Sequence, residues 1–452
     1  MSQFAVRRPL AAGQLASLFA SVRSSLFMFV VPAHVTAVAL LVCSPMVLQA
    51  TEPNKVNDGF TVSAKDWPWW RGPARNGEAA ADQQPPLEWN DSKNVLWRTP
   101  LVGRGHGSVC LMGDRIYLQT ADETSGAQAV VCLERSTGKQ LWSTTVHANG
   151  GMRKNNKSTA ASSTPACDGE RLFVNFPNNG ALITTAIDLN GKQLWQTKIC
   201  DYIEHQGYGS SPALYQSLVL ISADNKAGGA IAALDRKSGE IAWRRERPQL
   251  PNYPSPIVLN VAGKDQLVMT GCDKVTSYNP LTGETFWEVD GATTECVTST
   301  VTDGSHVFTS GGYPKNHMSA VLADGSGKKV WETDTRLYVP SLLVRDGYLF
   351  GVLDVGIAVC WKSTTGEEVW KARLGGTFSS SPVLVGDRIY ATSEAGDTFV
   401  FRADTTKFEQ LAKNKLGDEI LSTPVICDSR IYYRAAQMID GKREEFLFCL
   451  GE

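Results

Sequence analysis

A short polar turn followed by an alternating polar and apolar strand recurs along most of this chain. Six copies end in tryptophan, and a seventh, at 406–411, has lost it; the six occupy residues 136–142, 190–195, 238–243, 282–287, 326–331 and 365–370. Successive tryptophans lie 39 to 53 residues apart. A repeat of this length indicates a supersecondary unit that is used many times over.

Each copy predicts a β-hairpin. The glycine of the turn, such as Gly239, supplies the positive φ that a tight turn needs. An apolar strand precedes each turn, for example Ala230–Leu234, and a half-buried strand follows it up to the tryptophan. An isolated hairpin is barely stable in water, so we expect each tryptophan to pack against the next repeat. Burying one tryptophan contributes at most roughly 5 kcal/mol.

Four short strands per unit predict an all-β, eight-bladed propeller with almost no helix. Each unit begins with a Ser/Thr-Pro element or a looser copy of it, and eight second strands follow short turns, as in Gly386–Tyr390. Val95–Leu101 resembles a tryptophan strand without a preceding repeat, while the last unit, ending at Phe446–Leu450, lacks one. We therefore expect the two to pair and close the ring. Seven blades is the alternative, if the unit at 378–416, which has no tryptophan, is incomplete. The tryptophans assigned to the repeats are Trp97, Trp142, Trp195, Trp243, Trp287, Trp331 and Trp370.

The repeats resemble those of pyrroloquinoline-quinone-type (PQQ-like) propellers, and Leu234–Trp243 is the closest copy. The resemblance covers about residues 66–450. It implies the fold of quinoprotein alcohol dehydrogenases and of the periplasmic scaffold lipoprotein of outer-membrane protein assembly, both with eight blades. Trp67–Gly77 together with Gly105-His106-Gly107-Ser108 also resembles exported bacterial propellers of unassigned function.

The first 94 residues differ from the repeats. Residues 1–50 carry early arginines and then an uncharged apolar stretch, which predicts a cleaved signal peptide and a periplasmic or secreted protein. A retained membrane anchor at 24–49 is the alternative, as is lipidation of Cys43. Residues 51–94 predict a linker and a tryptophan-rich segment, and residues 95–452 the propeller. Trp67–Gly77 is interpreted either as a carbohydrate platform or, preferably, as a staple that fixes the segment to the propeller.

The composition is that of a soluble globular protein, with 42% hydrophobic and 20% charged residues. A net charge of −2 and the lack of a basic patch exclude nucleic-acid binding by charge. We expect a monomer that touches a membrane only through a retained N-terminal segment.

No catalytic constellation, cofactor site or metal site is recognised. The quinone enzymes that the repeats resemble have two adjacent cysteines over the cofactor and carboxylates with an asparagine around Ca²⁺. None of the ten cysteines here is adjacent to another, so we expect neither PQQ nor Ca²⁺. Cys272 and Cys296 are the preferred disulfide pair, while Cys132, Cys360 and Cys449 are interpreted as core residues.

Four unequal loops, at 147–160, 201–208, 311–317 and 434–445, are predicted to share one face of the ring with His106 and His147. Loops on a rigid ring commonly carry function. The candidate partner or ligand residues are His106, Arg153, Lys154, Lys157, Tyr202, His205, Tyr208, Tyr313, Lys315 and His317. The sequence favours a non-catalytic exported scaffold that binds an envelope protein or a saccharide. A quinone-dependent oxidoreductase and a carbohydrate-binding propeller are the alternatives.

Overall fold

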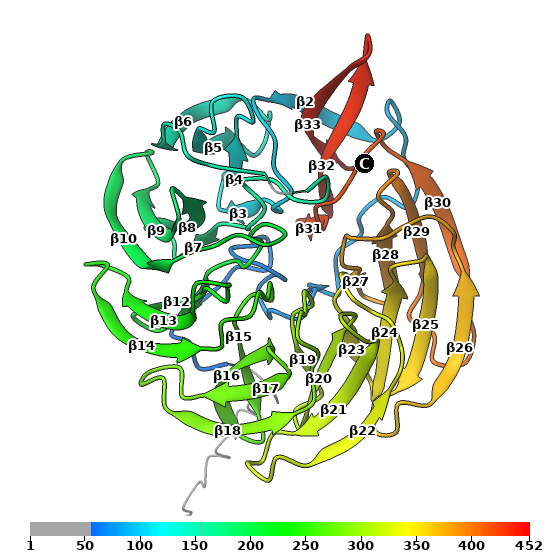
Figure 1. The fold of residues 1–452 in the computed structure, drawn as a ribbon. Coiled ribbons are helices and arrows are strands. Elements are labelled where there is room, and N and C mark those ends of the chain that lie inside the picture. The colour runs from blue at the N-terminus through cyan, green and yellow to red at the C-terminus, as the bar shows by residue number, and fades with distance from the viewer. Residues whose placement is uncertain (1–55, 154) are drawn as a thin grey trace, which may run out of the picture. The chain divides into compact units, whose positions relative to one another are not determined.

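The turn-and-tryptophan copies form the outer hairpins of eight four-stranded antiparallel blades arranged in a ring (Figure 1). The computed structural model describes residues 56–153 and 155–452. The predicted signal peptide, its anchor alternative and Lys154 lie outside these residues. The described part of the chain contains no helix of the length and apolarity that crossing a bilayer requires.

Each blade runs from a short inner strand to a long outer one. Blade 1 consists of β3 (Cys110–Met112), β4 (Arg115–Ala121), β5 (Gln128–Glu134) and β6 (Gln140–His147), and blade 2 of β7 (Ala166–Cys167), β8 (Arg171–Asn178), β9 (Ala181–Asp188) and β10 (Gln193–Asp201). Blade 3 consists of β11 (Ala213–Tyr215), β12 (Leu218–Ser222), β13 (Gly229–Asp235) and β14 (Ile241–Arg247), and blade 4 of β15 (Ile257–Val261), β16 (Lys264–Gly271), β17 (Lys274–Tyr278) and β18 (Thr285–Asp290).

The remaining blades follow the same order, except that blade 8 takes its outer strand from the beginning of the ring. Blade 5 consists of β19 (Val301–Thr302), β20 (His306–Gly311), β21 (His317–Leu322) and β22 (Lys329–Thr333), and blade 6 of β23 (Leu343–Arg345), β24 (Tyr348–Leu353), β25 (Ile357–Lys362) and β26 (Glu368–Arg373). Blade 7 consists of β27 (Val383–Val385), β28 (Arg388–Thr392), β29 (Asp397–Arg402) and β30 (Gln410–Lys415), and blade 8 of β31 (Val425–Cys427), β32 (Arg430–Ile439), β33 (Lys442–Leu450) and β2 (Val95–Leu101). The seven-bladed alternative is wrong because the unit without tryptophan is a complete blade.

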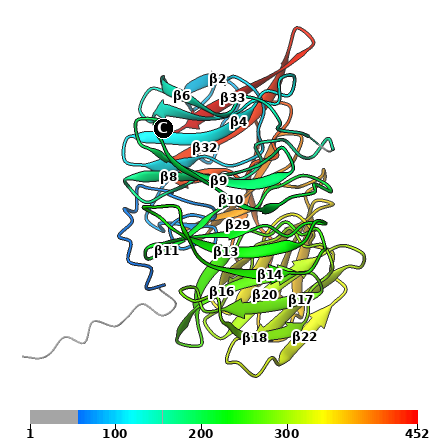
Figure 2. The same cartoon turned by 60° about the vertical axis from the view of Figure 1, so that its left-hand side comes forward.

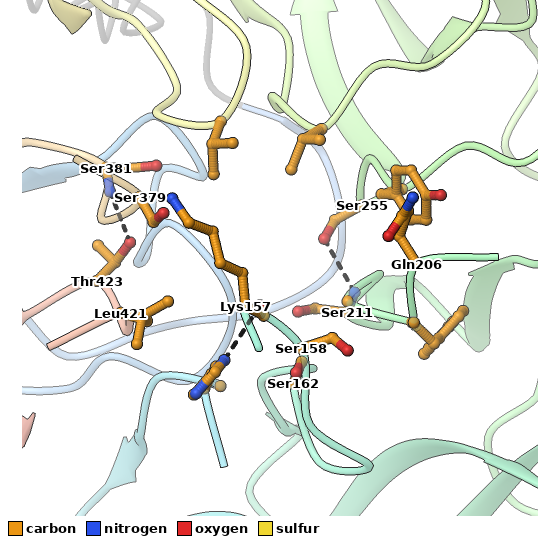
Figure 3. A pocket seen from close by; sticks show the side chains of 18 of the residues that line it. Lys157, Ser158, Ser162, Gln206, Ser211, Ser255, Ser379, Ser381, Leu421 and Thr423 are labelled. Carbon is orange, nitrogen blue, oxygen red and sulfur yellow. Dashed lines mark hydrogen bonds between the residues drawn. The ribbon is translucent and has the colours of Figure 1, made fainter. Parts of the chain in front are cut away.

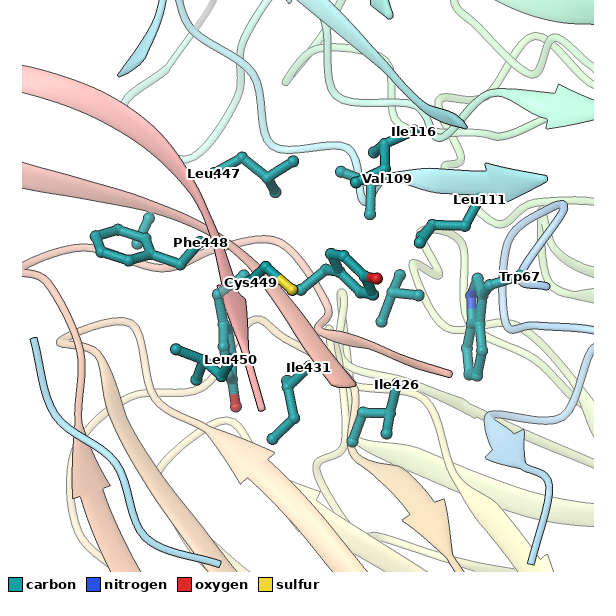
Figure 4. Close-up of a cluster of buried hydrophobic side chains, with 14 of the residues drawn as sticks. Trp67, Val109, Leu111, Ile116, Ile426, Ile431, Leu447, Phe448, Cys449 and Leu450 are labelled. Carbon is teal, nitrogen blue, oxygen red and sulfur yellow. The ribbon is translucent and has the colours of Figure 1, made fainter. Parts of the chain in front are cut away.

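The predicted ring closure is confirmed. Strand β2 pairs antiparallel with β33, with Trp97 opposite Cys449 and Arg98 opposite Phe448. The side chains beneath this pairing form a continuous apolar cluster with the inner strand of blade 1 (Figure 4). The last blade therefore has no unpaired edge towards β2.

Six of the seven repeat tryptophans pack on the turn of the next blade, as the sequence predicts. In six of the seven, the indole Nε1 donates a hydrogen bond of 2.7–3.2 Å to a backbone carbonyl of the following blade. Trp287 instead donates to Gln266 Oε1 of its own blade. The turn glycine must be small as well as left-handed, because a Cβ on Gly239 (φ +75°) would lie 2.5 Å from the Trp195 ring. This contact explains why Gly and Trp recur together.

Gly239→Ala is expected to lower the free energy of unfolding by about 2–3 kcal/mol, from the left-handed backbone and the overlap with Trp195 together. Gly263→Ala is the matched control, since Gly263 has φ +71° but no atom lies within 4 Å of the place where its methyl group would stand. It should cost only about 1 kcal/mol. Urea unfolding followed by tryptophan fluorescence measures both, and equal losses would mean that the Trp195 contact contributes nothing.

Trp67–Gly77 is a staple, as preferred from the sequence. Trp67 and Trp69 are buried. The N-terminal segment, in blue, lies at the side of the ring next to β11 in Figure 2. Its contacts are Trp67 with Leu111 of blade 1, Pro68 with Cys167 of blade 2, Arg75 with Leu214 of blade 3, Trp70 with Ser299 before blade 5, and Arg71 with Leu342 before blade 6. Strand β1 (Glu78–Ala79) then adds to blade 7, parallel to β27.

Candidate functional site

A central cup of about 760 Å³ lies where the connections between blades meet the ring axis (Figure 3). Its walls come from the connections that enter the inner strands, and Tyr313 comes from the hairpin between β20 and β21. Trp70 of the stapled segment is part of the lining. A cavity of this volume accommodates a small ligand or a few side chains of a partner.

A ring of hydroxyl groups surrounds the axis, one from each blade entry. Its members are Ser108, Thr164, Ser211, Ser255, Ser299, Ser341, Ser381 and Thr423. At six junctions the backbone N–H of one member donates to the hydroxyl of the next at 2.9–3.0 Å. Ser108 Oγ donates to the Thr423 carbonyl at 2.8 Å, and Ser299 Oγ accepts from Trp70 Nε1. The Ser/Pro elements seen in the sequence are therefore interblade hydrogen-bonding groups.

A chain of polar groups lies on one wall of the cup. Lys226 Nζ is 2.9 Å from His205 Nδ1, and His205 Nε2 is 3.4 Å from Glu295 Oε1. Because an ammonium group can only donate, His205 Nδ1 accepts and its Nε2–H faces Glu295. Tyr338 OH donates to Glu295 Oε2 at 3.4 Å. Burial and the charge of Glu295 raise the pKa values of Tyr253 and Tyr338, so both phenols stay protonated.

On another wall, Lys157 Nζ forms an ion pair of 2.7 Å with Glu394, which also accepts from Ser379 Oγ at 2.5 Å. His106 Nδ1 lies 3.3 Å from the Lys157 carbonyl. Burial, reinforced by the Arg104 and Arg434 guanidinium groups, lowers the pKa of His106 to about 3. His106 is therefore neutral at physiological pH and is no acid–base group there.

Apolar side chains gather on the loops of the same face. Of the large hydrophobic residues that the structure describes, six are more than half exposed: Val102, Met152, Ile203, Tyr313, Val355 and Met438. All six lie in connections between blades or between second and third strands, or at the tip of such a hairpin. In an antiparallel blade these two kinds of connection share one face. A face that carries these exposed apolar side chains as well as a cavity is a candidate interaction surface.

Half of the predicted residues line the cup: His106, Lys157, His205, Tyr208 and Tyr313. Arg153 pairs with Glu123 at 3.1 Å instead, and Lys315 is exposed on the hairpin beside the cup. Tyr202 is buried and packs edge-to-face on Tyr208, whose hydroxyl donates to the Ser222 carbonyl.

The loop predicted at 434–445 was wrong, whereas those at 147–160 and 311–317 are present and only their end residues belong to strands. His147 ends β6, with its ring against Phe176, and His317 begins β21, buried with Nε2 2.7 Å from the Gly291 carbonyl. Neither lines the cup. The predicted loop at 434–445 consists of the long strands β32 and β33, joined by a turn at Asp440–Gly441, because the strand alternation continues beyond the ring.

The preferred disulfide is also wrong. Cys272 and Cys296 are separate buried thiols, like the other described cysteines. Each faces a different partner: Cys272 Sγ lies 3.7 Å from Asp224, and Cys296 Sγ lies 3.4 Å from Thr293 Oγ1.

Three residues of the cup, Tyr253, Glu295 and Tyr338, carry no signal in the sequence. They stand alone in short connections between blades, without a motif or unusual spacing. Only the ring geometry brings them together with His205.

The described residues do not fit the quinone and calcium arrangement that the resemblance implies. Glu295 is the single carboxylate among the cup-lining residues. In 56–153 and 155–452 no three His, Cys, Asp or Glu side chains gather as metal ligands, whereas Ca²⁺ takes six to eight oxygens.

Comparison with known proteins places the repeats in one family. The family described as outer membrane protein assembly factor BamB matches residues 87–202, 126–372 and 314–411. The polyvinylalcohol dehydrogenase of Sphingopyxis sp. (strain 113P3) is 28% identical over 218 residues, which is 45% of this chain and 31% of that protein. The enzyme of the same name from Pseudomonas sp. is 29% identical over 38% of this chain and 27% of its own length. The chain thus matches less than a third of each.

Solved structures share the fold at low identity. BamB from Moraxella catarrhalis has a TM-score of 0.55 and 13% identity, covering 78% of this chain and 98% of its own. Europium-containing methanol dehydrogenase has a TM-score of 0.60 and 12% identity, covering 86% and 98%. With most of the chain matched by the family, this protein belongs to the PQQ-like repeat β-propellers typified by the outer membrane protein assembly factor BamB.

Proposed function

We propose that this chain is an exported, non-catalytic propeller that serves as an interaction scaffold and binds a protein of the cell envelope on its cup face. The observation that carries the proposal is the gathering of all six highly exposed hydrophobic side chains on the face that holds the cup. Its family membership and the fold shared with BamB support a scaffold. A rigid ring presents these loops at little ordering cost.

The mixed chemistry of the face supports a polypeptide partner over a saccharide. Exposed apolar side chains such as Val102 and Met438 lie on the same face as a cup whose lining includes hydroxyl, imidazole and charged groups, and such mixed surfaces are found in many protein interfaces. Tyrosine, in particular Tyr313, is a residue type that anchors such interfaces.

Shortening 148–157 or 312–316 to a tight turn should leave the fold intact, since neither change touches a strand or a repeat tryptophan. It should weaken capture of the envelope partner at least tenfold, because each loop carries one of the exposed apolar residues. The measurement is affinity for the protein that the purified chain captures from native envelopes, with cross-linking sites mapped by mass spectrometry.

Lys237→Glu is the control, because Lys237 lies in a uniform turn between third and fourth strands, on the opposite face. It should bind the partner normally. Full affinity in both shortened variants, with cross-links on the opposite face, would refute the proposal that the partner binds on the face that holds the cup.

A quinone-dependent oxidoreductase is the second candidate, favoured by the relatives named polyvinylalcohol dehydrogenase. Reconstitution with PQQ and Ca²⁺, followed by dye-linked assays with alcohols or sugars, distinguishes the two. Stoichiometric binding with turnover would replace the scaffold proposal. Export is tested by mass spectrometry of the mature protein, which should lack residues 1–50.

A further inference from the structure

The cup contains one buried carboxylate that has no close cationic partner among the described residues. Glu295 lies between blades 4 and 5 and is 6% exposed. Its backbone is fixed, since Glu295 N–H donates to the Tyr313 carbonyl at 3.2 Å and its carbonyl accepts from Thr293 Oγ1 at 2.9 Å. These contacts hold the main chain at the cup wall, and the side chain there is buried.

The groups that face this carboxylate lie at long hydrogen-bonding distances from it. His205 presents Nε2–H, and Tyr338 presents its hydroxyl, each at 3.4 Å from a carboxylate oxygen. A charge-assisted hydrogen bond is normally about 2.7–2.9 Å long. A buried carboxylate gains most from a cation or from several close donors. The cup wall thus offers a charge that the described side chains compensate poorly.

Aromatic rings share this wall. Tyr253, Tyr313 and Tyr338 line the cup together with Glu295. The guanidinium of Arg336 lies 5.4 Å over the Tyr338 ring, with its N–H donated to the Gly312 carbonyl rather than to Glu295. Tyrosine faces attract organic cations, and a carboxylate among them adds direct pairing.

The chemistry of this wall suits an organic cation better than a metal ion. A divalent metal requires several oxygen ligands, whereas this wall supplies a single carboxylate and phenols that stay protonated. An ammonium or guanidinium group needs only one carboxylate, neutral acceptors and ring faces.

We infer that the cup is a cation-binding site, in which Glu295 and the surrounding tyrosines receive a lysine or arginine side chain of a protein partner. That the cation belongs to a protein side chain, and not to a small molecule, rests on the proposed scaffold function. The site would be the anchor at the centre of the interface, with the exposed apolar side chains around it excluding water.

The test uses defined probes instead of the partner. Binding of N-acetyl-lysine methylamide and of the uncharged N-acetyl-norleucine methylamide to the full-length purified protein is measured by ligand-observed NMR titration. The lysine probe should bind at least about tenfold more tightly. Glu295→Gln, which keeps the shape of the side chain, should abolish this preference, and Glu444→Gln, an exposed carboxylate outside the cup, should retain it.

Tyr313→Ala and Tyr313→Phe provide a second measurement that does not depend on the folding of Glu295→Gln, since Tyr313 is half exposed. The alanine variant should bind the lysine probe several-fold more weakly, and the phenylalanine variant as wild type. Equal binding of both probes by wild type, or an unchanged preference in Glu295→Gln, would overturn the inference.

A third probe, n-butylamine, separates the sources of the cation. Weaker binding than the lysine amide supports a polypeptide, and equal binding refutes the polypeptide source while leaving a small-amine site. These titrations contain no partner, so a negative result would refute the cation site without affecting the loop-shortening test of the scaffold face. Likewise, a negative loop-shortening test would refute the scaffold face without affecting the preference for the lysine probe.

Discussion

Replacing Asp224 with alanine is expected to lower the free energy of unfolding by about 3–5 kcal/mol. Arg247 holds the Asp224 carboxylate with two hydrogen bonds, Nε to Oδ1 at 2.6 Å and Nη2 to Oδ2 at 2.9 Å, and both side chains are buried. Asn252 Nδ2 donates to the same carboxylate at 3.1 Å. Without Asp224 the guanidinium stays buried and unpaired, which costs far more than a surface ion pair contributes. Urea unfolding at pH 7 measures the loss.

The double variant Asp224→Leu with Arg247→Met is the control for this pair. Replacing both partners by apolar groups removes the unpaired charge, so the double variant should be more stable than Asp224→Ala. A double variant no more stable than Asp224→Ala would show that the ion pair itself, and not the stranded charge, supplies the stability.

His106 should make the protein sensitive to acid well above the range in which carboxylates titrate. Its pKa is about 3 in the folded protein, through burial and then the neighbouring Arg104, Arg434 and Arg443, but 6.5 when unperturbed. Between these values the unfolded state binds the extra proton. The stability from a neutral His106 is therefore fully present above pH 6.5 and falls by about 1.4 kcal/mol per pH unit towards pH 3.

At pH 4 this residue alone should cost about 3 kcal/mol relative to pH 7. His106→Gln, which can still contact the Lys157 carbonyl, removes the titration. Urea unfolding of both proteins at pH 7 and pH 4 should show that wild type loses about 3 kcal/mol more than the variant. An imidazole that titrates near its unperturbed pKa by NMR would contradict the prediction.

The ring could be predicted from the sequence because the contact that joins neighbouring blades comes from a short motif that recurs in successive repeats. Gly239 and Trp195 occupy matching places in successive copies, and the contact between them is the interblade contact itself. The orphan strand at Val95–Leu101 and the missing strand after Phe446–Leu450 then left a single way to close.

The cup could be predicted only in part. Long loops with tyrosine or histidine stand out in the sequence, and His205 and Tyr313 lie in two of them. Glu295 lies in a short connection like several others, and its importance comes from Tyr338 and His205 approaching it from neighbouring blades. The path of Trp67–Gly77 was equally hidden, since it is held by single hydrogen bonds to many blades rather than by a strand pattern.

The closure of the ring by β2 has a consequence for how quickly the protein reaches its native state. Strand β2 precedes every blade in the chain, but its partner β33 is the last described strand. The pairing must therefore bring together segments separated by almost the whole propeller, and such distant contacts fold slowly. Until then β2 and β33 each keep an unpaired edge that can recruit another chain. We expect aggregation during refolding to come from this pair of strands more than from the seven blades that each close within themselves.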